Sequence, residues 1–194
     1  MEERDACGVG FIASVAGIAT HKLIEQSLSA LGCLEHRGGC SADQDSGDGA
    51  GIMTAIPWQL IEEWSAQNAI SLPPREHLGI GMVFLPQEES LVKKARAIVE
   101  EVLSGENLKV LGWRVVPVQE LVLGIQAREN QPQIEQIIVA SPKLKGDELE
   151  RSLFKARRRI GKALDLDGTL KWTEDFYICS FSNRTIVYKG MVRS

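Results

Sequence analysis

A cysteine close to the amino terminus, Cys7, stands in a sequence context that suits covalent chemistry. It belongs to "RDACGVGF", residues 4–11, and has Gly8 and Gly10 beside it. A thiol with an ordinary pKa of about 8.5 needs a nearby base or positive charge to become a nucleophile. Glycines beside it let a substrate or another backbone approach closely. The alternative is that Cys7 is a small apolar residue within a strand, as many cysteines are.

No histidine is an evident base for this thiol. The chain has three, His21, His36 and His77, and none of them stands in a recognisable Cys-His pattern. If residues 1–6 were removed, the freed α-amine of Cys7, with a pKa of about 7.7–8.0, would serve as the base. Nucleophile and base would then belong to one residue. This design predicts a propeptide at 1–6 and a strand at 7–15 that holds the nucleophile in a sheet.

A second motif follows at residues 34–52, "LEHRGGCSADQDSGDGAGI". Three aspartates in it, Asp43, Asp45 and Asp48, suggest calcium, but Asp48 would occupy the position where an EF-hand loop requires glycine. The Gly-Lys-Ser/Thr ending of a phosphate-binding loop is also missing. The preferred interpretation is a turn-rich loop whose aspartates cap backbone amides.

The elements that must position these motifs alternate between strands and helices. Apolar periodicity predicts helices at 19–39, 58–68, 88–107 and 146–166, and strands at 51–56, 78–86, 109–118 and 133–142. The strand at 51–56 should be buried, and the segment 119–132 is left open. The last stretch, 176–192, is interpreted as a hairpin that turns near Ser182-Asn183. This pattern favours an α+β architecture of layered sheets with helices packed outside.

The pairing of "ERDACGVGF" with "LEHRGGCSADQDSGDGAG" resembles the amino-terminal glutaminase domain of glutamate synthases. These are class II glutamine amidotransferases of the N-terminal-nucleophile hydrolase group. The resemblance extends to "SNRTIVYKGM" and covers nearly the whole chain. It implies an αββα fold with residues 7–194 as the amino-terminal part of the domain, and we expect later strands to be missing at the carboxyl end.

In that family the cysteine corresponding to Cys7 attacks the side-chain amide of glutamine and releases ammonia, which later domains use to aminate 2-oxoglutarate. Those domains use FMN and an iron–sulfur cluster, and no part of this sequence resembles them. By the resemblance, Gly8, His36, Arg37 and Gly38 support the active site. Arg37 would order the active-site loop by donating to backbone carbonyls. The alternative is an arginine solvated at a helix end.

Two elements of the family pattern have no counterpart in this sequence. These are segments resembling "HxRFSTNT" and "HNGEINT", which carry the oxyanion donors and the clamp for the glutamine α-groups. Asn183 precedes Arg184 and so does not form the Asn-Gly pair of an oxyanion hole. The sequence thus predicts the front part of a larger enzyme that is inactive alone. The alternatives are an inert or regulatory fragment and, less favoured without a C-x-x-C pair, a redox protein that pairs Cys7 with Cys33 or Cys40.

Composition excludes several other classes of function. The formal net charge of -4 provides no basic field for nucleic acid or for a membrane surface. No apolar run approaches the roughly 20 residues of a spanning helix, and the first residues, "MEERDA", are acidic. We therefore expect a cytoplasmic protein whose partners are L-glutamine and the remainder of a glutamate synthase subunit. Its basic cluster at Lys155 and 157–159 is interpreted as a solvated helix face.

Overall fold

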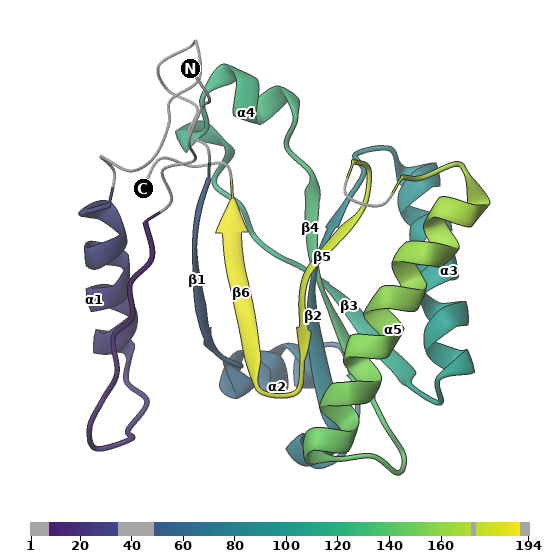
Figure 1. Cartoon of the computed structure of the whole chain (residues 1–194), viewed down its shortest axis with the longest axis horizontal. Helices are drawn as coiled ribbons and strands as arrows, with labels where there is room; N and C mark the ends of the chain where they lie inside the picture. Colours follow the sequence, from purple (N-terminus) through teal and green to yellow (C-terminus); the bar gives the residue numbers. More distant parts are fainter. Residues whose placement is uncertain (1–7, 35–48, 172–173, 191–194) are drawn as a thin grey trace, which may run out of the picture. The chain divides into compact units, whose positions relative to one another are not determined.

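The computed structural model describes residues 8–34, 49–171 and 174–190, which contain both helices and antiparallel strands (Figure 1). The helices are α1 (His21–Gly32), α2 (Trp58–Gln67), α3 (Glu89–Gly105), α4 (Ile125–Glu129) and α5 (Gly146–Asp167), with short 3-10 turns at Arg75–His77 and Glu120–Val122. The strands are β1 (Ala50–Ala55), β2 (Leu78–Leu85), β3 (Lys109–Val115), β4 (Gln133–Ala140), β5 (Tyr177–Ser182) and β6 (Thr185–Gly190). The predicted α+β class is confirmed.

The chain divides into two compact units. One holds the described parts of residues 1–52, 118–131 and 188–194, and the other holds 53–117 and 132–187. The second unit contains a four-stranded antiparallel sheet in the order β3-β4-β2-β5. Strand β2 lies inside this sheet, paired with β4 from Leu78 opposite Ala140 to Leu85 opposite Gln133. Its long apolar run is explained by this position, since all of its residues except Phe84 are buried.

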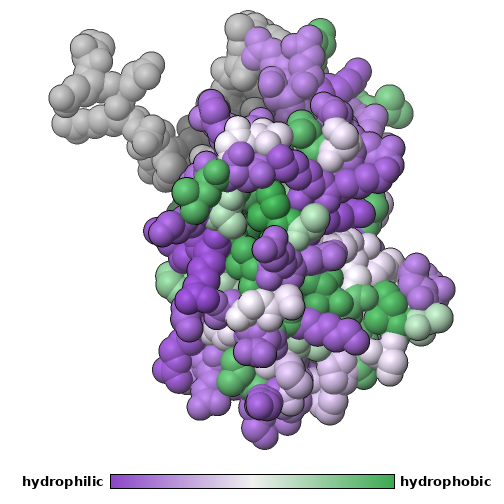
Figure 2. All heavy atoms as spheres, turned by 90° about the vertical axis from the view of Figure 1, so that its right-hand side faces the viewer, coloured by the Kyte–Doolittle hydropathy of each residue, from purple (hydrophilic) through white to green (hydrophobic). Residues whose placement is uncertain are grey.

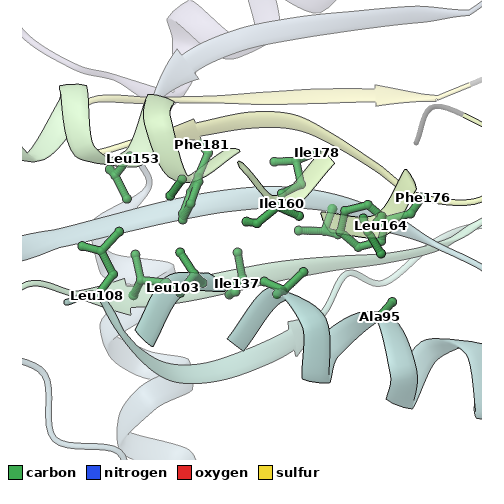
Figure 3. Packing of buried hydrophobic residues seen from close by; sticks show 14 of the residues in the cluster. Ala95, Leu103, Leu108, Ile137, Leu153, Ile160, Leu164, Phe176, Ile178 and Phe181 are labelled. Carbon is green, nitrogen blue, oxygen red and sulfur yellow. The ribbon is translucent and has the colours of Figure 1, made fainter. Parts of the chain in front are cut away.

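Helices α3 and α5 lie side by side and pack on the four-stranded sheet (Figure 1). Both have apolar residues every three or four positions, which places those side chains on one face. The buried faces are Val92, Ala95, Val99 and Leu103 in α3, and Leu149, Leu153, Ala156, Ile160 and Leu164 in α5. Figure 3 shows the α5 side chains directed into the shared apolar cluster. Burial of this cluster stabilises the unit that carries α5.

Two glycines in β2 leave room for side chains of α5 and β4. A Cβ atom at Gly79 would lie 2.6 Å from Leu153 Cδ1, and one at Gly81 would lie 2.6 Å from Ile137 Cγ2. Both separations are shorter than carbon atoms tolerate, so neither position accepts a larger residue without displacing its neighbours. The glycines that weaken the strand pattern in "LGIGMVFL" are therefore required by packing.

Strands β1 and β6 pair with each other in a separate two-stranded sheet. The strand predicted at 51–56 is present as β1, but its predicted burial is wrong, because exposed and half-buried residues alternate along it and Met53 is 70% exposed. The hairpin prediction for 176–192 is also wrong in its pairing. Although the chain turns between β5 and β6, β5 joins β2 while β6 joins β1. A turn signal indicates a reversal of the chain but does not determine which strands pair after it.

The predicted strand at 7–15 is not present in its described part, residues 8–15. A strand requires a hydrogen-bonding neighbour, and none is paired with this segment in the part of the chain that the structure describes. The side chains of Val9 and Phe11 are each 93% exposed. The helix predicted from 19 ends at Gly32, earlier than its expected stop at Gly38-Gly39, which lies outside the described residues. None of the described helices is long and apolar enough to cross a membrane.

Candidate active site

The residues that the sequence places in the active site lie mostly outside the described part of the chain. These residues are Cys7, His36, Arg37 and Gly38. Gly8 is described, and it is exposed in a segment without regular secondary structure. The roles of the nucleophile and of its expected supports therefore stay predictions from the sequence.

Helix α1 connects the two sequence motifs, because it follows the Cys7 segment and precedes the loop that contains His36. The helix begins after Thr20, which has the extended backbone typical of an N-cap, and Cys33 closes it. His21, at its first turn, lies 3.7 Å from the carboxylate of Glu25, one turn along the helix. Its apolar face is only partly covered, and Leu28 is 52% exposed.

The turn between β5 and β6 is fastened to the first turns of α5. Glu150 accepts hydrogen bonds from Ser182 Oγ at 3.0 Å and from the Asn183 backbone N–H at 2.8 Å. The Asn183 side chain donates to the carbonyl of Gly146 at 2.8 Å. Arg184 forms an ion pair with Asp147 in the same turn of α5. Asn183, which the sequence did not favour as an oxyanion donor, and Arg184 are thus both engaged in holding this turn.

Two other side chains of a type that could take part in catalysis, a cysteine and a histidine, contact backbone carbonyl oxygens. Cys179 is half-buried, and its thiol lies 3.5 Å from the carbonyl oxygen of Val187. Nδ1 of His77 lies 3.0 Å from the carbonyl oxygen of Leu144. These contacts join neighbouring segments of one unit.

Sequence reasoning missed a buried ionic group in β4. Glu135 has a fully buried side chain, while Arg96 on α3, its partner, is 32% exposed. Nε of Arg96 donates to Glu135 Oε2 at 3.1 Å, and its guanidinium lies 5.4 Å from the ring of Trp113. The sequence "QIEQIIVA" gave no sign that this glutamate is buried, because polar and apolar residues do not alternate regularly along it. This pair joins a helix to the sheet.

Comparison with known proteins defines the class. The family model for class II glutamine amidotransferases matches residues 7–194. The chain is 62% identical over 195 residues to ferredoxin-dependent glutamate synthase 2 of Synechocystis sp., and 51% identical over 193 residues to ferredoxin-dependent glutamate synthase of Pyropia yezoensis. It is 45% identical over 195 residues to ferredoxin-dependent glutamate synthase 1 of Arabidopsis thaliana. All of the chain is covered in each case, and it spans 12% of the length of these relatives.

The chain belongs to the class II glutamine amidotransferases. Its fold agrees with this assignment, because helices pack on an antiparallel sheet and a second antiparallel sheet is present. The resemblance that rests on the motifs around Cys7 and His36 is thereby confirmed at the level of the family.

Proposed function

We propose that Cys7, freed at its amino end, is the nucleophile of glutamine amide hydrolysis. Residues 1–6 would be a propeptide, and residues 7–194 the amino-terminal part of the amidotransferase domain of a glutamate synthase. The observation that supports this best is that the family match begins at Cys7 itself, the residue whose α-amine would be needed as the base. The ammonia produced would serve glutamate synthesis from 2-oxoglutarate.

The chemistry follows from the two groups of Cys7. The α-amine takes the thiol proton, and the thiolate attacks the side-chain carbonyl carbon of glutamine. The carbon–nitrogen bond then breaks, and the proton returns to the leaving nitrogen, which departs as ammonia. Water hydrolyses the resulting glutamyl thioester, releases glutamate and restores the thiol. The pKa values of an ordinary α-amine and thiol, about 7.7–8.0 and about 8.5, are close enough for this transfer near neutral pH.

The supporting roles are proposed by position in the sequence motif. Gly8 leaves room beside the nucleophile for the substrate, because it has no side chain. Arg37, between His36 and Gly38, has a planar group with several N–H donors that suits it to order a loop through backbone carbonyls.

The partners of this reaction lie largely outside the chain. They are L-glutamine and the remainder of a glutamate synthase polypeptide, with ferredoxin as the electron donor, in agreement with the names of the relatives. The FMN and iron–sulfur cluster of such enzymes are assigned to later domains. The four cysteines of this chain include no C-x-x-C pair and do not suit a cluster. The cytoplasm stays the expected location.

The alternative is an inert piece that binds other parts of the enzyme without catalysis. It is favoured by the absence from the sequence of segments resembling "HxRFSTNT" and "HNGEINT". Loss of one oxyanion donor alone lowers the rate by roughly 10²–10³. Both readings agree that the chain by itself does not turn over glutamine.

Ammonia release from glutamine separates the two readings. We expect none above background from the purified chain, and steady release from a chimeric protein in which the chain replaces the matched residues of the Synechocystis relative. Because that relative supplies the missing motifs, an inactive but folded chimera would favour the inert fragment. Steady release by the purified chain would contradict the assignment of the oxyanion donors and the clamp to segments outside it.

A further inference from the structure

Helix α5 carries an uninterrupted basic surface. Between Arg151 and Leu164 it contains no acidic residue and six cations: Arg151, Lys155, Arg157, Arg158, Arg159 and Lys162. Four of these, Arg151, Lys155, Arg158 and Lys162, recur at spacings of four, three and four, which places them along one side of the helix. We call these four residues the basic stripe. All are exposed, and they span about 16 Å at 1.5 Å per residue.

The basic stripe is unfavourable for the helix that carries it. Arg151 and Lys155 are like charges one turn apart, as are Arg158 and Lys162, and such pairs destabilise an exposed helix. Cations favour the last turn of a helix because of its dipole, but the last turn of α5 contains no basic residue. Neither helix formation nor the helix dipole accounts for the stripe.

Cations elsewhere in this unit are mostly paired with carboxylates. Arg75 pairs with Glu62, Lys94 with Asp167, and Lys171 with Glu174. Hydrogen bonds within these pairs lower the pKa of Glu62 and Asp167 and raise the pKa of Lys171.

The basic stripe differs from these pairs. Lys155 lies 3.9 Å from Glu106, whose carboxylate also meets Arg159. For the side chains of Arg151, Arg158 and Lys162, no ion pair or hydrogen bond is present within the described residues. Three cations on one side of a helix therefore lack a counterion in this part of the chain.

Apolar side chains accompany the basic stripe. Phe154 is 62% exposed and lies on the helix surface beside Arg151 and Arg158, three and four residues away. A shallow depression between α3 and α5 is lined by apolar residues, by Arg159 and by two carboxylates: Ile98, Val102, Ala163, Leu166, Glu101 and Asp167. Figure 2 views the molecule from the helix side and shows hydrophobic atoms gathered among hydrophilic ones on this face. Exposed aromatic residues and arginines are the side chains most enriched in protein interfaces.

We propose that the basic stripe and Phe154 dock an acidic, partly apolar surface of the polypeptide that lies outside these residues in the full-length relatives. This rests on the proposed function, in which the chain is the front part of a larger enzyme. The relatives are about eight times longer than the matched stretch, since it makes up 12% of their length. A protein surface fits better than nucleic acid, because the net charge of -4 opposes a polyanion and because a polyanion would leave Phe154 and the depression uncovered.

Lysine acetylation measured by mass spectrometry tests this surface directly. Lys155 and Lys162 should react about tenfold more slowly in the Synechocystis chimera than in the purified chain, since an interface excludes water and reagent from its centre. Lys93 on α3, 72% exposed, is the internal control. High ionic strength should restore part of the reactivity. Equal reactivity of the stripe lysines in both proteins would overturn the proposal.

Charge reversal gives an independent readout. In the chimera, Arg151→Glu with Arg158→Glu should return Lys162 to the reactivity it has in the purified chain. The matched control, Lys109→Glu with Lys143→Glu, reverses two exposed cations off the stripe and should leave Lys162 protected. If Lys162 stays protected from acetylation after Arg151→Glu and Arg158→Glu, the surface does not bind its partner through charge, which contradicts the proposal.

Two other outcomes would contradict the proposed docking surface. Stripe lysines that become protected in the purified chain as its concentration rises would indicate a second copy, and binding of RNA or anionic vesicles through the stripe would indicate a polyanion. Either outcome overturns the proposal. Ammonia release measured on the same chimera distinguishes failure of the docking proposal from failure of the proposed function. A chimera that releases ammonia but has reactive stripe lysines contradicts the docking proposal and leaves the proposed function intact.

Discussion

Replacing Cys7 with serine is expected to lower ammonia release by the Synechocystis chimera by on the order of 10⁴- to 10⁶-fold, as removal of a covalent nucleophile does in other hydrolases. The hydroxyl of serine holds its proton far more tightly than a thiol does, so a nearby amine of ordinary basicity produces little attacking anion. Glutamine binding should persist, because serine keeps the shape of the site. Ammonia release and glutamine affinity are therefore measured on the same preparation.

Cys33→Ser is the matched control for this variant. Cys33 is exposed at the carboxyl end of α1, and we assign it no part in the chemistry. This control should retain the full rate of ammonia release. A Cys7→Ser protein that keeps more than about a tenth of the rate contradicts the nucleophile, since serine at this position supplies no comparable path.

Replacing Arg96 with methionine should destabilise the unit that contains the four-stranded sheet by about 3–5 kcal/mol. The variant leaves the carboxylate of Glu135, whose side chain is fully buried, without its charged partner. Methionine keeps an apolar stem that can lie against Trp113, so the loss is mainly that of the charge. Urea unfolding followed by far-ultraviolet circular dichroism measures the free energy of unfolding.

Two further variants establish that the effect comes from burial. Arg96→Met combined with Glu135→Leu removes both charges and should recover most of the lost stability, because an apolar pair replaces a buried ion pair at little cost. Lys93→Met breaks the exposed pair with Glu89 on the same helix and should change the free energy of unfolding by less than about 1 kcal/mol. A loss in Arg96→Met no larger than in Lys93→Met would show that Glu135 is not held by this pair.

Local periodicity was sufficient to predict the elements that build the four-stranded sheet and its helices. Helices α3 and α5 have apolar residues at helical spacing, β2 is an apolar run of strand length, and β4 ends in the apolar run 137–140. The predictions that failed depend on partners distant in sequence. The segment from Gly8 to Val15 has strand-like residues but no pairing strand among the described residues, and β5 and β6 turn locally yet join different sheets.

The candidate site was predicted in a different way. No periodicity distinguishes Cys7 from a core cysteine, and the assignment depends on its combination with the His36 motif, which the family match supports. The pairing of Glu135 could not be predicted from the sequence. A single acid inside a strand pattern does not reveal that an arginine on a helix will meet it, because that contact depends on how α3 packs on the sheet.

The central claim is that Cys7 works as an amino-terminal residue, and the intact mass of the purified chain tests it most directly. We predict a mass that corresponds to a chain beginning at Cys7, because only removal of residues 1–6 exposes the α-amine that acts as its base. A chain that retains Met1 to Ala6 under conditions in which it folds would contradict this account. The thiol would then lack its proposed base, and the hypothesis of an inert fragment would be favoured.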